Sequence, residues 1–202
     1  MTGDSSGTSS SLDYAIVKYS NAGVPLWTNR YNGPGNHNDE ATAIAVDSSG
    51  NVFVTGYSYD SSLTYSSYAT VKYSSAGVPL WTRRYAGPRT AGTSGDFAYA
   101  VAVDSSGNAF ITGTSGNGSA TMAYSSAGVP LWTNRFNGNL YKMAVDRAGK
   151  VFGTGSSYNG TNYDYVTIKY SSSVSPPRLD FQRLNNQRVL NWTNAGFNLR
   201  RP

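Results

Sequence analysis

The sequence predicts an all-β fold of repeated four-stranded antiparallel sheets, and three observations lead to it. The 202 residues include 22 glycines and 13% aromatic residues but only 13% charged residues, which suits short strands joined by turns. No segment shows a helical period of apolar residues over more than one turn. The phrase Tyr-Ser-x-Ala-Gly-Val-Pro-Leu-Trp-Thr occurs three times, with its tryptophans at Trp27, Trp81 and Trp132. Four short strands in each period of roughly 50 residues are typical of the blades of a β-propeller.

Each repeat predicts four strands in a fixed order. The first, residues 14–19, is β-branched and aromatic and recurs at 68–73 and 165–170. The second, residues 26–31, follows a proline, which is tolerated at the start of a strand but not within its ladder. Two further strands follow it, one that alternates small and apolar residues and one rich in valine: 42–46 and 52–55.

The connection between the third and fourth strands is a tight turn. The phrase Asp-Ser-Ser-Gly-Asn stands at 47–51 and 104–108, and a weaker copy stands at 146–150. Aspartate accepts hydrogen bonds from nearby backbone amides, and glycine supplies a positive φ. The connections at the opposite end differ between repeats in length and sequence. In a propeller they all open on one face, the variable face, where we expect function to concentrate. These loops are 4–13, 32–41, 57–67, 86–97, 114–119 and 156–164.

The repeated phrases also resemble a known family. The string Tyr-Ala-Ile-Val-Lys-Tyr, then Pro-Leu-Trp-Thr-Asn-Arg-Tyr-Asn-Gly-Pro-Gly and Ala-Val-Asp-Ser-Ser-Gly-Asn-Val-Phe-Val-Thr-Gly, is similar to the SBBP repeat of bacterial β-propellers. The resemblance covers residues 1 to about 172. It implies a propeller fold and an extracellular or cell-surface parent protein. It implies no catalytic motif, because the family shares none.

We expect two units, a partial set of propeller blades at 1–177 and a basic C-terminal hairpin at 178–202. The hairpin resembles the opening of a fibronectin-like domain and stops before such a domain is complete. The start Met-Thr-Gly matches Val-Thr-Gly at 54–56, so the chain is expected to begin with the last strand of a missing blade. Residues 1–11 are too polar for a signal peptide. Because the repeats and the tail are both incomplete, we expect a piece of a longer gene product or an engineered fragment.

The strand count gives three complete blades plus a composite fourth. Exposed sheet edges favour pairing, so we expect some form of ring closure. One alternative is a four-bladed ring within one chain, completed by the tail hairpin. The favoured alternative is a larger ring closed by two chains as an isologous homodimer, since SBBP-like blades suit rings of more blades.

Composition excludes several functional classes. With no cysteine, the chain has no disulfide, no thiolate metal site and no cysteine nucleophile. No run of 18 apolar residues is present, so a membrane is not an expected partner. The segment after residue 177 holds five arginines and one acid, which gives +4 of the net charge of +5. Because the basic character belongs to the tail, nucleic acid is not an expected partner either.

The variable face collects the residues that could carry chemistry. Seven of the eleven carboxylates fall in its loops, together with the single histidine. Carboxylate oxygens suit calcium, and a histidine beside carboxylates suits zinc. The predicted ligands of such a divalent cation are Asp13, His37, Asp39, Glu40, Asp60, Asp96 and Asp164. His37, Asp39 and Glu40 are the candidate catalytic residues, with one of them as a base for metal-bound water. Alternatively, these acids are solvated loop residues that serve turns and solubility.

Three functions follow from these patterns. The first is a non-catalytic module of a secreted or surface bacterial protein, which binds a cation, small molecule, sugar or peptide through the variable face. Loop tyrosines at 57, 59, 65, 158 and 163 suit stacking on sugars. The second is a metal-dependent hydrolase of esters, lactones or phosphoesters. The third is a structural spacer.

Overall fold

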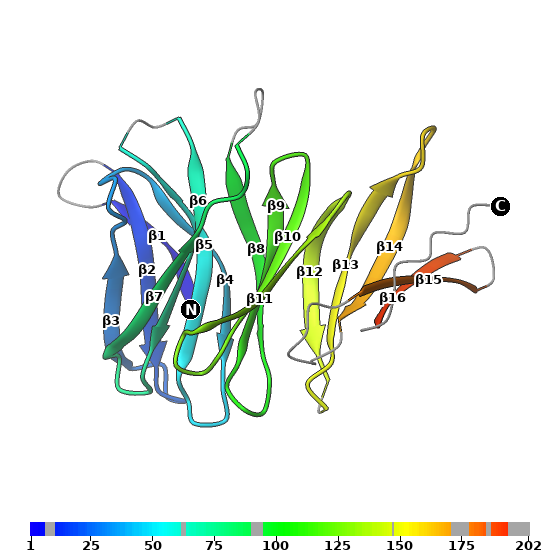
Figure 1. Ribbon diagram of the computed structural model, residues 1–202. Coiled ribbons are helices and arrows are strands. Elements are labelled where there is room, and N and C mark those ends of the chain that lie inside the picture. Colours follow the sequence, from blue (N-terminus) through cyan, green and yellow to red (C-terminus); the bar gives the residue numbers. More distant parts are fainter. Residues whose placement is uncertain are drawn as a thin grey trace.

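The computed structural model describes residues 1–6, 11–61, 64–89, 95–146 and 148–170, and the backbone of 178–184 and 187–193. These residues form sixteen strands in four sheets that lie in a row (Figure 1). The predicted all-β propeller fold class is confirmed. No helix in the described ranges has the length and apolar character needed to span a bilayer.

The first sheet has three antiparallel strands and the next two have four each. The order of the first is β1 (Thr2–Ser6), β2 (Leu12–Tyr19), β3 (Pro25–Tyr31). The order of the second is β4 (Asp39–Val46), β5 (Val52–Tyr59), β6 (Ser66–Tyr73), β7 (Pro79–Tyr85). The order of the third is β8 (Asp96–Val103), β9 (Ala109–Ser115), β10 (Gly118–Tyr124), β11 (Pro130–Phe136). Each of these sheets corresponds to one blade.

The fourth sheet has five strands, because the tail joins it. Its order is β12 (Asn139–Val145), β13 (Val151–Tyr158), β14 (Tyr163–Tyr170), β16 (Gln187–Thr193), β15 (Arg178–Leu184). β15 and β16, which fall within the predicted tail hairpin, pair antiparallel. β16 also pairs parallel with β14 over a short register. Residues 171–177 and 185–186, which include the predicted unit boundary and hairpin tip, lie outside the described residues.

The grouping of strands differs from the one expected from the repeat order. Breaks between sheets fall in the connections from β3 to β4, β7 to β8 and β11 to β12. The first such connection contains Gly33-Pro34-Gly35, and proline has no amide to donate to a ladder. In contrast, β5 and β6 pair without interruption from Val52↔Tyr73 to Tyr59↔Ser66. The start strand β1 is equivalent to β5, and β5 is the second strand of the second sheet. The chain therefore begins with the second strand of a blade and not with the last one.

The two kinds of connection lie at opposite ends of the sheets. Figure 1 shows the β4–β5, β8–β9 and β12–β13 turns at the lower end and the β5–β6, β9–β10 and β13–β14 connections at the upper end. The upper end is the predicted variable face. Parts of its loops, at 7–10, 62–63 and 90–94, lie outside the described residues.

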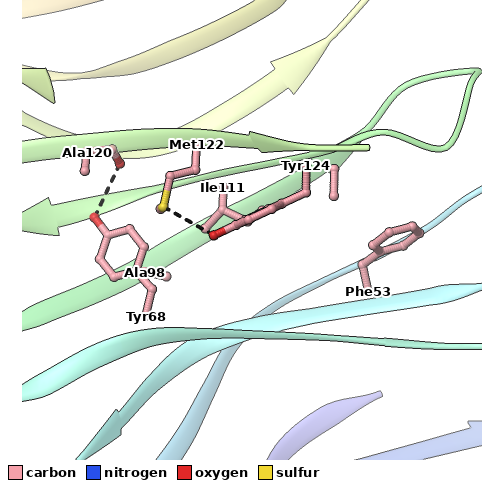
Figure 2. Packing of buried hydrophobic residues seen from close by; sticks show 8 residues of the cluster. Phe53, Tyr68, Ala98, Ile111, Ala120, Met122 and Tyr124 are labelled. Atoms are coloured by element: carbon pink, nitrogen blue, oxygen red, sulfur yellow. Dashed lines mark hydrogen bonds between the residues drawn. The ribbon is translucent and has the colours of Figure 1, made fainter. Parts of the chain in front are cut away.

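The buried hydrophobic residues of the described ranges form three clusters, and each cluster lies between two successive sheets. The cluster between the second and third sheets contains Phe53 and Tyr68 on one side and Ile111, Met122 and Tyr124 on the other (Figure 2). A similar cluster joins the first sheet to the second, and another joins the third to the fourth. Burial between neighbouring blades therefore holds the row together.

A repeated clasp reinforces these contacts at the lower end. The Lys18 ammonium and the Trp27 indole N–H both donate to the Ser75 carbonyl of the next sheet, at 2.7 and 3.1 Å. One sheet later, Lys72 and Trp81 donate to the Ser126 carbonyl at 3.0 and 3.1 Å. The lysine that precedes the repeated phrase and the tryptophan within it thus attach one blade to the next in these two repeats.

The Asp47 turn provides a testable contribution to stability. Its carboxylate accepts from the amides of Ser49 and Asn51 at 2.9 Å, and from the Asn51 side chain at 2.8 Å. The Lys72 ammonium lies 3.9 Å away, and both side chains are buried. Burial alone would raise the pKa of Asp47, but the hydrogen bonds from Asn51 and Ser49 and the charge of Lys72 outweigh it and lower the pKa.

We predict that Asp47→Asn lowers the free energy of unfolding by about 1–2 kcal/mol near neutral pH. Because the folded-state pKa is depressed, this stabilisation is present above the ordinary value of 3.8 and is lost as pH falls through the folded-state pKa. Urea unfolding of both proteins across acidic pH measures the difference. Asp104→Asn is the control, since Asp104 makes the same turn contacts but Ala123 stands where Lys72 stands. A pH-independent loss in Asp47→Asn would contradict the prediction.

Candidate functional site

Two of the predicted site residues, Asp39 and Asp96, fix the connections between sheets. Each begins the first strand of a four-stranded sheet and is buried. Asp39 Oδ2 accepts from the Gly33 amide at 2.5 Å, and Asp96 Oδ2 accepts from the Gly87 amide at 2.8 Å. These contacts attach the long inter-sheet loops to the sheets that follow them, and we call them the aspartate pins.

An arginine from the outer strand completes each pin. Arg84 donates to the Ser58 hydroxyl, to the Ser58 carbonyl at 3.2 Å and to the Tyr31 hydroxyl of the preceding sheet at 3.2 Å. Arg135 donates to the Ser115 hydroxyl and carbonyl at 3.0 and 2.8 Å, and to the Tyr85 hydroxyl at 3.0 Å. The network therefore occurs twice with the same residue types.

The third inter-sheet connection shows what the pins are for. Only Asn137 and Gly138 separate β11 from β12, and Gly138 stands at the register position of the pinning aspartate. No long loop is present there, and no aspartate is present to attach one. The pins therefore occur together with the long connections that they attach.

The environment of Asp39 agrees with this role. Burial raises the pKa of its carboxyl group, while the hydrogen bonds from Gly33 and Ser58 and the Arg84 charge oppose the rise. A carboxylate that is buried and bonded to a backbone amide has little access to water or substrate.

The other predicted site residues lie in separate local contacts. Asp13 is buried and pairs with Arg30 at 3.5 Å. Asp164 accepts from the Asn159 side chain at 2.9 Å within the β13–β14 loop. The Asp60 amide donates to the Tyr65 carbonyl at 3.1 Å, in the β5–β6 connection. His37 lies half-buried in the β3–β4 connection.

The seven predicted metal ligands are not gathered into one group. In the part of the chain that the structure describes, no three His, Asp or Glu side chains lie close enough to hold a metal ion together. The predicted cation site and the catalytic role of His37, Asp39 and Glu40 stay predictions.

A different set of residues meets near the upper end of β4, β5 and β8. The Tyr57 ring lies 4.9 Å from the Phe97 ring of the next sheet and 6.0 Å from the Tyr59 ring, both edge to face. Glu40 is the register partner of Tyr57. Burial is the largest cause that raises the pKa of Tyr57. The hydrogen bond to Glu40 and the negative charge of Glu40 raise this pKa further. We call Glu40, Tyr57, Tyr59 and Phe97 the aromatic–acid cluster.

Sequence reasoning found part of this cluster and missed the rest. Tyr57 and Tyr59 are predicted as stacking residues, and Glu40 is predicted as a ligand or base. Phe97 is not predicted. The available signal was the repeat itself, because Phe97 follows Asp96 as Glu40 follows Asp39.

The solved structures that resemble this fold include the following two. One is a protein of unknown function from Bacteroides caccae, with 14% identity and a TM-score of 0.46, covering 86% of this chain and 58% of that chain. The other is a gluconolactonase from Xanthomonas campestris, with 15% identity and a TM-score of 0.47, covering 96% of this chain and 62% of that chain. The chain thus spans about three fifths of each structure's length.

Sequence comparison gives a more specific result. No curated protein matches the chain in sequence. The model of the SBBP family, described as a beta-propeller repeat, matches residues 26–63 and 80–119. These segments run from β3 into the β5–β6 connection and from β7 to β10, so each crosses from one sheet into the next. Residues 26–63 and 80–119 therefore match a beta-propeller repeat, and the four sheets are arranged as propeller-like blades.

Proposed function

We propose that the protein is a non-catalytic binding module that holds a carbohydrate on the aromatic–acid cluster of its variable face. The observation that carries this proposal is a contrast within the repeats. The residues of the aspartate pins recur with the same chemistry in two successive sheets. The next residue pair along the same two strands differs from sheet to sheet: it is Glu40↔Tyr57, Phe97↔Thr114 and Asn139↔Ser156. Positions that repeat maintain the scaffold, whereas positions that vary are available for a ligand.

The chemistry of the cluster suits a sugar. Aromatic rings stack on the C–H face of a sugar ring, and a carboxylate accepts hydrogen bonds from its hydroxyl groups. Tyr57, Tyr59 and Phe97 are all half-buried, so they have both packing support and an exposed part. The non-catalytic character is supported by the use of Asp39 as a pin. A parent protein that is secreted or located on the cell surface would expose this face to such ligands.

A glycan array followed by calorimetric titration of the strongest ligands tests the proposal. We expect Tyr59→Ala and Glu40→Gln each to weaken binding by about tenfold or more, since each removes a stacking surface or a charged acceptor. Tyr163→Ala is the matched control, because Tyr163 is an exposed tyrosine of the same face in the fourth sheet.

Two results would contradict this function. One is an absence of glycan binding, or a loss as large in Tyr163→Ala as in the cluster variants. The other is chelator-sensitive turnover of esters, lactones or phosphoesters that is lost in Glu40→Gln, which would identify a metal-dependent hydrolase instead.

A further inference from the structure

Each sheet presents a different face to each of its neighbours. We call the side that faces the next sheet the donor face, because its side chains donate hydrogen bonds forward. Tyr14 donates to the Ala69 carbonyl at 3.1 Å, and Tyr68 donates to the Ala120 carbonyl at 3.4 Å. The side that receives these bonds is the acceptor face.

The acceptor face also receives the tryptophan of the preceding sheet. The Trp27 ring lies 6.2 Å from Tyr73 and covers Gly77, where a Cβ would come within 2.9 Å of the indole. The Trp81 ring lies 6.1 Å from Tyr124 and covers Gly128 in the same way. An acceptor face that packs against the preceding sheet therefore has a buried tyrosine and, next to it, a glycine covered by a tryptophan.

The fourth sheet has an uncovered donor face. Tyr165 stands at the register position of Tyr14 and Tyr68, and it is 82% exposed whereas they are 0% and 1% exposed. The Lys169 ammonium lies over the Phe152 ring at 5.6 Å, as the Lys72 ammonium lies over Phe53. Tyr165 and Lys169, two of the side chains that join one sheet to the next, are therefore in place, and Tyr165 is left exposed.

The first sheet has an uncovered acceptor face. Tyr19 stands at the register position of Tyr73 and Tyr124, and it is 44% exposed whereas they are 2% and 6% exposed. Gly23, the equivalent of Gly77 and Gly128, has nothing within 4 Å of a Cβ built on it. The two uncovered faces belong to sheets at opposite ends of the row, so one chain does not close the ring on itself (Figure 1).

We propose that a second copy of this chain covers both faces. The fourth sheet of each copy packs on the first sheet of the other, and the two copies of four sheets form a closed ring of eight. Tyr165 then donates to the carbonyl of Ala15 in the second copy, because Ala15 is the equivalent of Ala69 and Ala120. A second copy fits best because every copy carries one face of each kind, so a two-fold arrangement satisfies both at once. This proposal does not depend on the carbohydrate site.

Sedimentation velocity over a dilution series tests the assembly. We expect a dimer with twice the mass of the chain. Tyr165→Arg on the donor face and Tyr19→Arg on the acceptor face should each raise its dissociation constant by about 30-fold or more, as loss of a buried aromatic anchor does. Both tyrosines are exposed in the single chain, so the variants are expected to fold. Val78→Arg is the control, because Val78 is also exposed, at 57%, but belongs to neither end face.

Photo-crosslinking tests the location of the interface. The chain has no cysteine, so Tyr165→Cys carries a single thiol-linked benzophenone. We expect crosslinks between copies that map to β2, around Ala15. A chain that stays monomeric at all concentrations would overturn the proposal, as would an open polymer or crosslinks that map to the outer strand β3.

Discussion

Gly113→Ala is expected to lower the free energy of unfolding by about 3–5 kcal/mol, enough to unfold much of a marginally stable protein. A Cβ on Gly113 would overlap the Phe97 carbonyl oxygen and come within 2.6 Å of the Ala98 Cα. All of these atoms belong to the backbone of β8, beside the register shift between Ala98 and Ala100. The collision cannot be relieved by a rotamer change, so the strand pair must separate. Thermal and urea unfolding measure the loss.

Gly3→Ala is the matched control for this prediction. Gly3 occupies the same position in the first sheet, but among the described residues no strand lies beyond β1 and nothing approaches its Cβ position within 4 Å. We expect this substitution to change stability by no more than about 0.5 kcal/mol. If both variants lost the same free energy of unfolding, the cause would be a general property of glycine. The close approach of the β8 backbone would then not be the cause.

The sequence predicts the blades well because the repeated phrases contain the whole blade in order. Turn aspartates, positive-φ glycines and strand-initial prolines each mark a boundary, and the structure places the boundaries there. Which strands share a sheet was harder to predict. A circular repeat can be divided at any connection, and only the pairing in space shows that the break lies before β4 and not after β5.

The aspartate pins illustrate why the site was harder to predict than the fold. A loop aspartate can bind solvent, a metal ion or a backbone amide, and its residue type does not distinguish the three. Asp39 and Asp96 accept from backbone amides, a partner that the sequence does not identify. A signal was nevertheless present, because β4 and β8 begin with an aspartate and each follows a long connection that contains glycine and proline. The short connection through Gly138 has none.

Packing between blades supplies the second large effect. We expect Tyr68→Ala to lower the free energy of unfolding by about 3–5 kcal/mol, the usual range for loss of a buried aromatic ring. Tyr68 is 1% exposed, and Figure 2 shows it reaching from the second sheet to the Ala120 carbonyl of the third. Tyr165→Ala is the control, measured at a dilution where the chain is monomeric. Because Tyr165 is 82% exposed, its loss should be small.

Tyr68→Phe separates the ring from the hydroxyl. We expect it to cost only about 1 kcal/mol near neutral pH, since the ring stays buried and one hydrogen bond is lost. The pKa of Tyr68 is raised well above its ordinary value of 10.0, mainly by burial and secondly by the negative charge of Asp96. The contribution of Tyr68 to the free energy of unfolding is therefore fully present below pH 10, and it is lost as the pH rises through the folded-state pKa. The phenylalanine variant lacks this titration, so its unfolding free energy should fall less steeply in alkaline solution. An identical alkaline slope in the two proteins would mean that the Tyr68 hydroxyl reaches water and that the contact between the second and third blades opens readily.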